Sequence, residues 1–121
     1  MNILAVDYGK KRIGLAWVQV GLDVILPYGV VGNMGELVKL IKEEKIDKVV
    51  IGMPTGLDGK ENENTKRVKK FADELKSKIN LPIEFEDERF SSRQADSMGG
   101  EVSRDEKSAM VILQGYLDKN I

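Results

Sequence analysis

The sequence predicts an α/β protein built on one mixed β-sheet, and the order of its apolar segments carries this prediction. Three strand-like segments follow one another near the N-terminus without a helix between them, which is typical of an antiparallel meander. After them, helical segments alternate with short apolar strands, and strands joined through a helix pair in parallel. With 121 residues, the chain is long enough to bury one core, so we expect a single domain over residues 1–121.

The strands of the meander are expected at residues 2–7, 12–19 and 24–31. They are rich in Ile, Val and Leu, and short turn-like stretches separate them. The first strand ends in Asp7-Tyr8-Gly9, and Gly32-Asn33 breaks the pattern after the third.

Helices and strands alternate in the rest of the chain. Helical spacing of apolar residues predicts a helix over 34–45, and residues 47–53 form a buried strand. Residues 81–86 form a short strand, and the last helix begins at Ser103. A second helix lies between these strands, and its apolar stripe is Val68, Phe71, Ala72, Leu75 and Ile79.

Composition excludes several kinds of chemistry. The chain has no cysteine and no histidine, which excludes disulfides, thiolate or imidazole metal sites, cysteine nucleophiles and a Ser-His-Asp triad. Its apolar runs are far shorter than the ~20 residues that a membrane-spanning helix requires. Met1 leads directly into a strand without the basic start of a signal peptide. We therefore expect a cytoplasmic protein that does not contact membranes.

Carboxylates stand at the ends of two predicted strands. Asp7 ends the first strand, and Asp87-Glu88 follows the last one. Chemistry in α/β sheets gathers at the carboxyl ends of parallel strands, so these side chains are candidates for one site. The alternation of side chains along a strand leaves open whether Asp87 or Glu88 points toward that site.

A third carboxylate comes from the last helix. Ser103 and Glu106 fit a capping box, which places Asp105 in the first helical turn. Asp105 precedes Ala109 by one helical turn and so lies over the buried stripe. A favourable interaction with the helix dipole is the alternative explanation for an acidic residue at this position.

Three converging carboxylates without histidine or cysteine suit a hard cation with oxygen ligands, Mg²⁺ or Mn²⁺. Without a cation they would repel one another, and the pKa of at least one would rise. Two bound metal ions would relieve this repulsion and hold the attacking and leaving oxygens of a phosphodiester displacement. The pattern therefore raises the hypothesis of a nuclease.

Four motifs, in this order, make the pattern more specific. They are DYGKKRIGLA at 7–16, VIGMPTGLDG at 50–59, DERFSS at 87–92 and DEKSAMVILQGYL at 105–117. Together they resemble the YqgF family, also called RuvX, of bacterial proteins with a ribonuclease H-like fold. The resemblance extends over essentially the whole chain.

The resemblance implies a metal-dependent nuclease, a hydrolase related in fold to the RuvC junction resolvases. Members are described as nucleases that mature the 5′ end of the 16S ribosomal RNA precursor, a step of ribosome biogenesis, and earlier as Holliday junction resolvases. The family's acidic positions match Asp7, Glu88 and Asp105 as catalytic residues and ligands of Mg²⁺ or Mn²⁺. The choice of Glu88 over Asp87 comes from the resemblance.

Substrate-binding residues are expected beside these carboxylates. Glycine at position 9 permits a tight turn and close approach of a phosphate, and the three basic residues after it can neutralise backbone phosphates unless they form only a solvated hairpin tip. The loop after residue 53 offers a hydroxyl and free N–H groups, or is an ordinary glycine-rich turn. Arg89 could instead pair with Asp87. The candidates are Gly9, Lys10, Lys11, Arg12, Thr55 and Arg89.

Other functions fit parts of the sequence. Cleavage of four-way DNA junctions requires a symmetric dimer, whereas the apolar stripes here are used by one core, which favours a monomer acting on one strand of nucleic acid. A non-catalytic nucleic-acid-binding module would gain nothing from an acidic centre. Sugar kinases and actin-like ATPases share the Asp-x-Gly hairpin but need two such domains. The basic residues at 66–70, opposite the stripe of their helix, are expected to form a solvated face.

Overall fold

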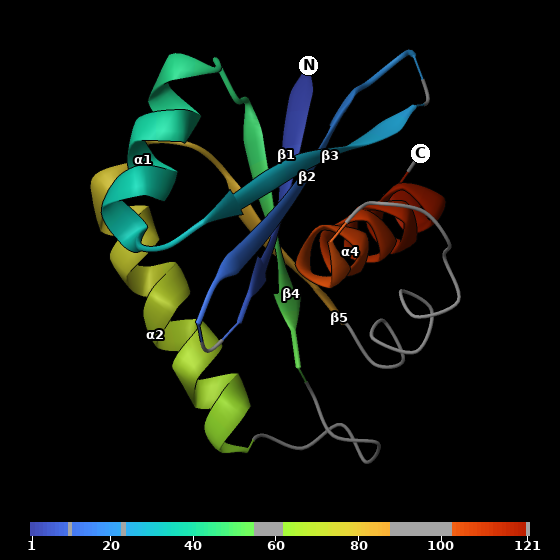
Figure 1. Ribbon diagram of the computed structural model, residues 1–121. Helices are drawn as coiled ribbons and strands as arrows, with labels where there is room; N and C mark the ends of the chain where they lie inside the picture. The colour runs from blue at the N-terminus through green and yellow to red at the C-terminus, as the bar shows by residue number, and fades with distance from the viewer. Residues whose placement is uncertain (10, 23, 55–61, 88–102, 121) are drawn as a thin grey trace.

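The computed structural model describes residues 1–9, 11–22, 24–54, 62–87 and 103–120 (Figure 1). Its strands are β1 (Asn2–Tyr8), β2 (Ile13–Gln19), β3 (Ile25–Val31), β4 (Lys48–Met53) and β5 (Ile83–Asp87). Its helices are α1 (Met34–Glu43), α2 (Glu63–Lys78) and α4 (Arg104–Asn120). In this part of the chain, no helix is both long and apolar enough to cross a membrane.

The five strands form one mixed sheet in the order β3-β2-β1-β4-β5. The first three pair antiparallel, whereas β4 is parallel to β1 on one side and to β5 on the other. The predicted meander and the predicted alternation of helices and strands are both confirmed. Helix α2 begins before its apolar stripe, at Glu63, because the Asn62 side chain caps it by accepting a hydrogen bond from the Thr65 N–H at 2.9 Å.

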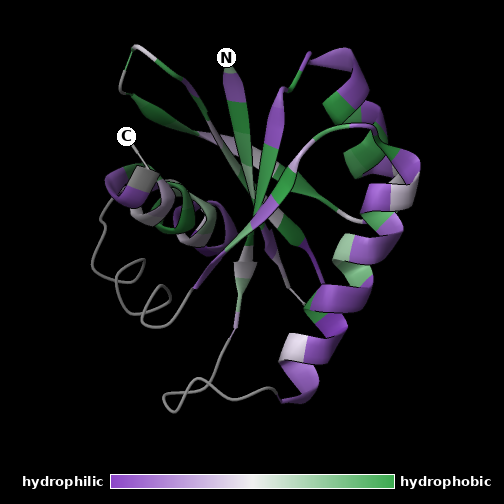
Figure 2. Ribbon diagram, turned by 180° about the vertical axis from the view of Figure 1, so that it is seen from behind, coloured by the Kyte–Doolittle hydropathy of each residue, from purple (hydrophilic) through white to green (hydrophobic). Residues whose placement is uncertain are grey.

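Helices cover both faces of the sheet. Helices α1 and α2 lie on one face and α4 on the other (Figure 1), and the polar sides of α1 and α2 face outward (Figure 2). Side chains of β1 point alternately to the two faces of the sheet. Leu4 and Val6 pack under α1 and α2, whereas Ile3 and Ala5 pack under α4. Each such buried side chain larger than alanine contributes roughly 1.5–3 kcal/mol.

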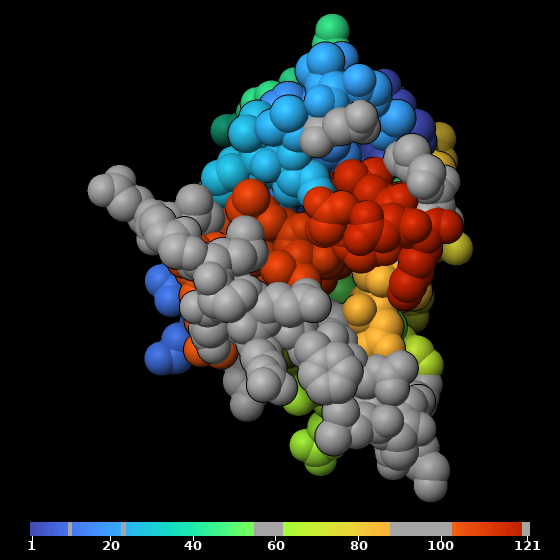
Figure 3. All heavy atoms as spheres, turned by 90° about the vertical axis from the view of Figure 1, so that its right-hand side faces the viewer, coloured from blue at the N-terminus to red at the C-terminus, as the bar shows by residue number. Residues whose placement is uncertain are grey.

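Helix α4 lies against the N-terminal strands as well as β4 and β5. In the space-filling view of Figure 3 its atoms, orange to red, meet those of the β2–β3 region, blue to cyan. Far from the C-terminal end of β4, a polar cluster fixes the helix to the sheet. Lys48 Nζ lies 2.8 Å from Glu84 Oε2 and donates to the Tyr116 hydroxyl at 2.9 Å, and that hydroxyl donates to Glu84.

Glu84→Gln is expected to cost about 1 kcal/mol of unfolding free energy at neutral pH and less in acid. The hydrogen bond from Lys48, and then that from Tyr116, hold the pKa of Glu84 below its ordinary value of 4.5. The stabilisation is therefore present above the unfolded-state pKa and is lost as the pH falls through the lower folded-state pKa. Solvent screening limits its size, because the side chain is 44% exposed.

Urea unfolding of the two proteins between about pH 7 and pH 3 checks this expectation. A stability difference that stays constant over this range would contradict it.

Candidate active site

Asp7 lies on the face of the sheet that α4 covers. It continues the series of Ile3 and Ala5, which pack under this helix, because successive side chains of a strand alternate between faces. Its side chain is half-buried at the C-terminal end of β1. Its partner on β2 is Gly14. A side chain at position 14 would stand roughly 5 Å from that of Asp7 on the same face.

Gly14 brings Asp105 to the same place. A Cβ atom at position 14 would lie 2.1 Å from the carbonyl oxygen of Asp105 and 2.8 Å from its Cβ. Such distances are sterically impossible, so only glycine allows the first turn of α4 to rest on β2 here. The two predicted carboxylates therefore lie on the same face at one edge of the sheet, with Asp7 beside Gly14 on β1 and Asp105 over Gly14 on α4.

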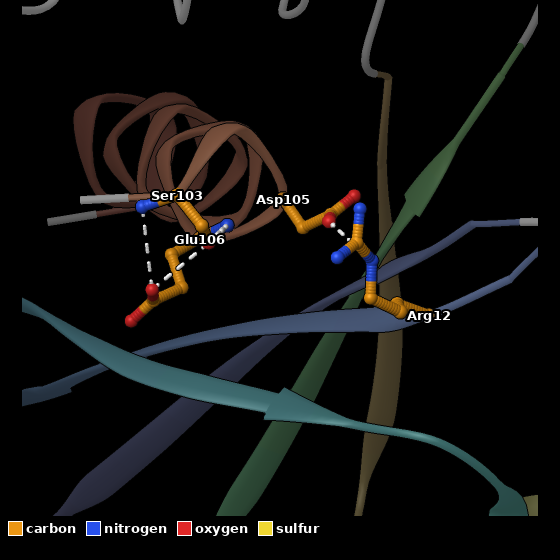
Figure 4. Close-up of polar contacts among 4 residues, drawn as sticks. All are labelled: Arg12, Ser103, Asp105 and Glu106. Atoms are coloured by element: carbon orange, nitrogen blue, oxygen red, sulfur yellow. Dashed lines mark hydrogen bonds and ion pairs between the residues drawn. The ribbon is translucent and has the colours of Figure 1, made fainter. Parts of the chain in front are cut away.

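The start of α4 is fixed by the predicted capping box. The Glu106 N–H donates to Ser103 Oγ at 3.2 Å, and Glu106 Oε1 accepts from the Ser103 N–H at 3.4 Å (Figure 4). The other carboxylate oxygen of Glu106 accepts from the backbone N–H of Gly29 on β3 at 2.7 Å. Glu106 is thus hydrogen-bonded both to Ser103 at the start of the helix and to Gly29 in the sheet, and these bonds fix the position of its neighbour Asp105.

The turn between β1 and β2 carries a basic residue to Asp105. The Gly9 N–H donates to the Arg12 carbonyl at 3.0 Å, and a Cβ on Gly9 would lie 2.6 Å from that oxygen, so the turn requires glycine. Arg12 Nε lies 3.3 Å from Asp105 Oδ2, and Figure 4 shows the two side chains pointing toward one another. Arg12 is 66% exposed and Asp105 is 28% exposed, so the ion pair is open to solvent. Lys11 is also exposed.

Strand β5 ends at Asp87, one of the two residues between which the sequence left a choice. Glu86 faces α4, because Lys119 Nζ lies 2.8 Å from its buried Oε2. Asp87 pairs with Met53, whose side chain belongs to the core under α1 and α2. Asp87 therefore lies on the face of the sheet opposite to α4. Glu88 lies outside the described residues.

The structure describes part of the predicted site. Glu88, Lys10, Thr55 and Arg89 lie outside the described residues. The described ranges contain no group of three acidic residues placed to hold a metal ion. Of the three predicted ligands, these ranges include Asp7 and Asp105, which the fold places together.

Arg67 is a residue at this edge that the sequence interpretation assigned to a solvated face. Its Nη2 donates to the Tyr8 carbonyl at 3.2 Å and its Nη1 to the Gly9 carbonyl at 3.5 Å. The available signal was spacing, since Arg67 precedes Phe71 of the apolar stripe by one helical turn. The neighbouring Lys66 and Lys70 are exposed, as expected.

Comparison with known proteins identifies relatives over nearly the whole length. The model of the RuvX family, described as Holliday junction resolvase, matches residues 1–119. A protein of Dictyoglomus turgidum named "Putative pre-16S rRNA nuclease" is 38% identical, with 98% of this chain and 94% of the relative covered. A protein of the same name from Desulforamulus reducens is 36% identical, with 98% and 97% covered.

Solved structures show the same fold. RuvC of Thermus thermophilus in complex with a Holliday junction substrate superposes with a TM-score of 0.69 at 12% identity, covering 99% of this chain and 97% of RuvC. The predicted ribonuclease H-like fold is thereby confirmed. The family model matches nearly every residue of this chain, and more than a third of the aligned residues are identical in each of the two relatives. The chain therefore belongs to the RuvX family.

Proposed function

We propose that this protein is a metal-dependent nuclease that hydrolyses a phosphodiester bond in the maturation of the 5′ end of the 16S ribosomal RNA precursor. The observation that carries the proposal is that Asp7 pairs with Gly14 on the face that α4 covers, while Asp105 rests directly on Gly14. Carboxylates alone repel phosphate, and a bound metal cation would let them act on a phosphodiester. The names of the family's relatives support the substrate.

The donor set fits a hard cation. Carboxylate oxygens are the preferred protein ligands of Mg²⁺ and Mn²⁺. Gly9 leaves room beside one of them, because even a Cβ at position 9 would remain 3.9 Å from Asp105 Oδ1. Asp7, Asp105 and Glu88 would hold the ion. When bound, the ion supplies charge that activates water and stabilises developing negative charge on the phosphate.

The residues of the β1–β2 turn bind the strand to be cut. In the protein without substrate, Arg12 neutralises one carboxylate oxygen of Asp105. In the complex its guanidinium turns to a phosphate, for which a planar, forked donor is well suited. Lys11 and Lys10 add charge beside it, and the glycine turn keeps side chains out of the way of the backbone. Thr55 and Arg89 are proposed as further phosphate contacts.

We propose that the protein acts as a monomer of one domain, because a single cut in RNA requires only one active site. A nuclease that matures ribosomal RNA acts where ribosomes are assembled, which places it in the cytoplasm.

The test is cleavage of two end-labelled substrates side by side in the presence of Mn²⁺. One is a 16S ribosomal RNA precursor with its 5′ extension, and the other is a four-way DNA junction. We expect cleavage of the RNA, and no cleavage by the Asp7→Asn protein. Binding of both substrates without cleavage of either would overturn the proposal in favour of a binding module.

Junction cleavage is the second candidate, because the description of the family model names it. It predicts cutting of the DNA junction alone, at two symmetric positions, by a dimer. Light scattering of the free protein and of its complex with each substrate separates the two candidates, since RNA processing by one active site requires no dimer.

The double variant Lys11→Gln with Arg12→Gln is expected to weaken binding of RNA without unfolding the protein. Two lost phosphate contacts should lower the slope of log affinity against log salt by about 2. The exposed Arg12–Asp105 pair contributes at most about 1 kcal/mol to stability. Filter binding of the RNA over a range of salt concentrations measures the slope.

Lys39→Gln with Lys42→Gln is a matched control, because it also removes two positive charges, from exposed residues of α1 of which Lys39 is paired only loosely with Glu43, at 4.0 Å. A double variant whose salt slope equals that of this control would contradict a role of the turn in phosphate binding.

A further inference from the structure

We infer that Arg67 is a positioning residue for catalysis, which holds the end of β1 so that Asp7 points toward α4. The inference rests on the proposed nuclease function and adds to it a residue on the opposite layer of the fold. Arg67 belongs to α2, whereas Asp7 and Asp105 lie on the face that α4 covers. It therefore acts through the backbone of β1 and not by contact with the phosphate.

The contacts of Arg67 are made to the two residues that follow Asp7. One terminal nitrogen, Nη2, donates to the carbonyl of Tyr8 at 3.2 Å, and the other, Nη1, donates to that of Gly9 at 3.5 Å. These carbonyls lie at the point where the strand ends and the turn begins. Two donors on one rigid plane fix the orientation of both peptide units, and so restrict the backbone torsions next to Asp7.

Aromatic packing strengthens this contact. The Arg67 guanidinium carbon lies 4.6 Å from the centroid of the Tyr8 ring. The Tyr8 ring in turn stacks on Phe71, with centroids 4.0 Å apart and an angle of 15° between planes. Arg67 and Phe71 stand one turn apart on α2, so one helix holds Tyr8 through both its ring and its carbonyl group. Because Tyr8 and Asp7 are neighbours on a strand, fixing Tyr8 toward α2 directs Asp7 toward α4.

The charge of Arg67 is not used in an ion pair within the described ranges, unlike those of Arg12, Lys48 and Lys119. Its buried Nε–H also has no hydrogen-bond partner in that part of the chain. The side chain is thus held by backbone carbonyls and a ring. Lysine has no planar fork and cannot bind two successive carbonyls while lying flat on an aromatic ring. This explains why residue 67 is an arginine, whereas its basic neighbours Lys66, Lys69 and Lys70 are exposed lysines.

The experiment compares Arg67→Gln, Arg67→Lys and a control, Lys66→Gln, which removes the same charge from an exposed neighbour on α2. Two readouts are taken: kcat and KM on the RNA precursor, and hydrogen exchange of the Gly9 amide, which donates to the Arg12 carbonyl. For Arg67→Gln we expect kcat to fall roughly a hundredfold, since displacements of about 1 Å have this effect. KM should change by less than about threefold.

In the same variant, the Gly9 amide hydrogen should exchange at least about tenfold faster, because the turn is released. The exchange rates of the β4 amides should stay unchanged. Arg67→Lys should recover part of kcat, and Lys66→Gln should behave as wild type. Unchanged kcat together with unchanged Gly9 exchange would overturn the inference. A rise in KM with a smaller salt slope and wild-type kcat would also overturn it, since Arg67 would then be a phosphate ligand.

Failure of the proposed function gives a different result. If the wild-type protein cuts no RNA, the nuclease proposal falls, and Gly9 exchange in the three variants alone decides whether Arg67 holds the turn. If Arg67→Gln does not fold, the comparison of Arg67→Lys with wild type provides both readouts.

Discussion

Asp7→Asn is expected to abolish RNA cleavage, with kcat reduced by about a thousandfold or more, in a protein that remains folded. Loss of one carboxylate from the proposed cation site removes both a ligand and a charge, and metal assistance is worth several kcal/mol, each 1.36 kcal/mol being tenfold in rate. The fold should persist because asparagine has the same shape and the Asp7 side chain is only half-buried. Single-turnover cleavage in the presence of Mn²⁺ measures the loss.

A binding measurement separates a lost cation from a lost fold. Mn²⁺ titrated into the wild-type protein and into Asp7→Asn should bind the variant more weakly, while circular dichroism of the two proteins stays the same. Asp73→Asn is the matched control, because Asp73 is exposed on α2, and this variant should cleave as wild type. If Asp7→Asn cleaves RNA at the wild-type rate, the Asp7 carboxylate takes no part in the mechanism.

The element ends at which Asp7 and Asp105 stand could be predicted from the sequence, because both depend on local signals. A strand that ends in Asp7-Tyr8-Gly9 and a helix that begins with a capping box each fix their own carboxylate at an end of an element. Where α4 begins on the sheet depends on its close approach to Gly14, which these local signals do not predict.

The choice between Asp87 and Glu88 could not be made in this way. Which face a residue of β5 takes depends on its register with β4, and the sequence of β5 has glutamate on one face and both apolar and acidic residues on the other. The pairing of Asp87 with Met53 assigns its face, and only the pairing could. Hydrophobic alternation, the usual guide, separates Ile83 and Phe85 from Glu84 and Glu86, but it does not show which of the two faces α4 covers.

Arg67 was missed for a different physical reason. Its partners are backbone carbonyls of a distant strand end, which leave no trace in the side-chain pattern of α2. In a run of basic residues, composition favours a solvated face for all of them. The position one turn before Phe71 was the only local indication that this residue borders the core.

Gly14→Ala is expected to cost about 1–3 kcal/mol of unfolding free energy and to reduce kcat by about a hundredfold. Its Cβ would meet the carbonyl oxygen of Asp105 at 2.1 Å, and this oxygen belongs to backbone that cannot turn aside as a side chain does. The start of α4 must therefore move away from β2. Because that movement takes Asp105 away from Asp7, stability and activity should fall together. Urea unfolding and single-turnover cleavage measure the two losses.

Gly32→Ala distinguishes this steric effect from the general effect of replacing glycine. The nearest atom to a Cβ at position 32 is a Glu36 carboxylate oxygen at 3.7 Å, an ordinary contact with a flexible side chain. Both substitutions restrict the unfolded chain equally, so their difference reports the clash alone. If Gly14→Ala is as stable and active as Gly32→Ala, α4 does not rest on β2 at this point. Asp105 would then need another reason to lie beside Asp7, and the proposed site would lose the contact that brings its two described carboxylates together.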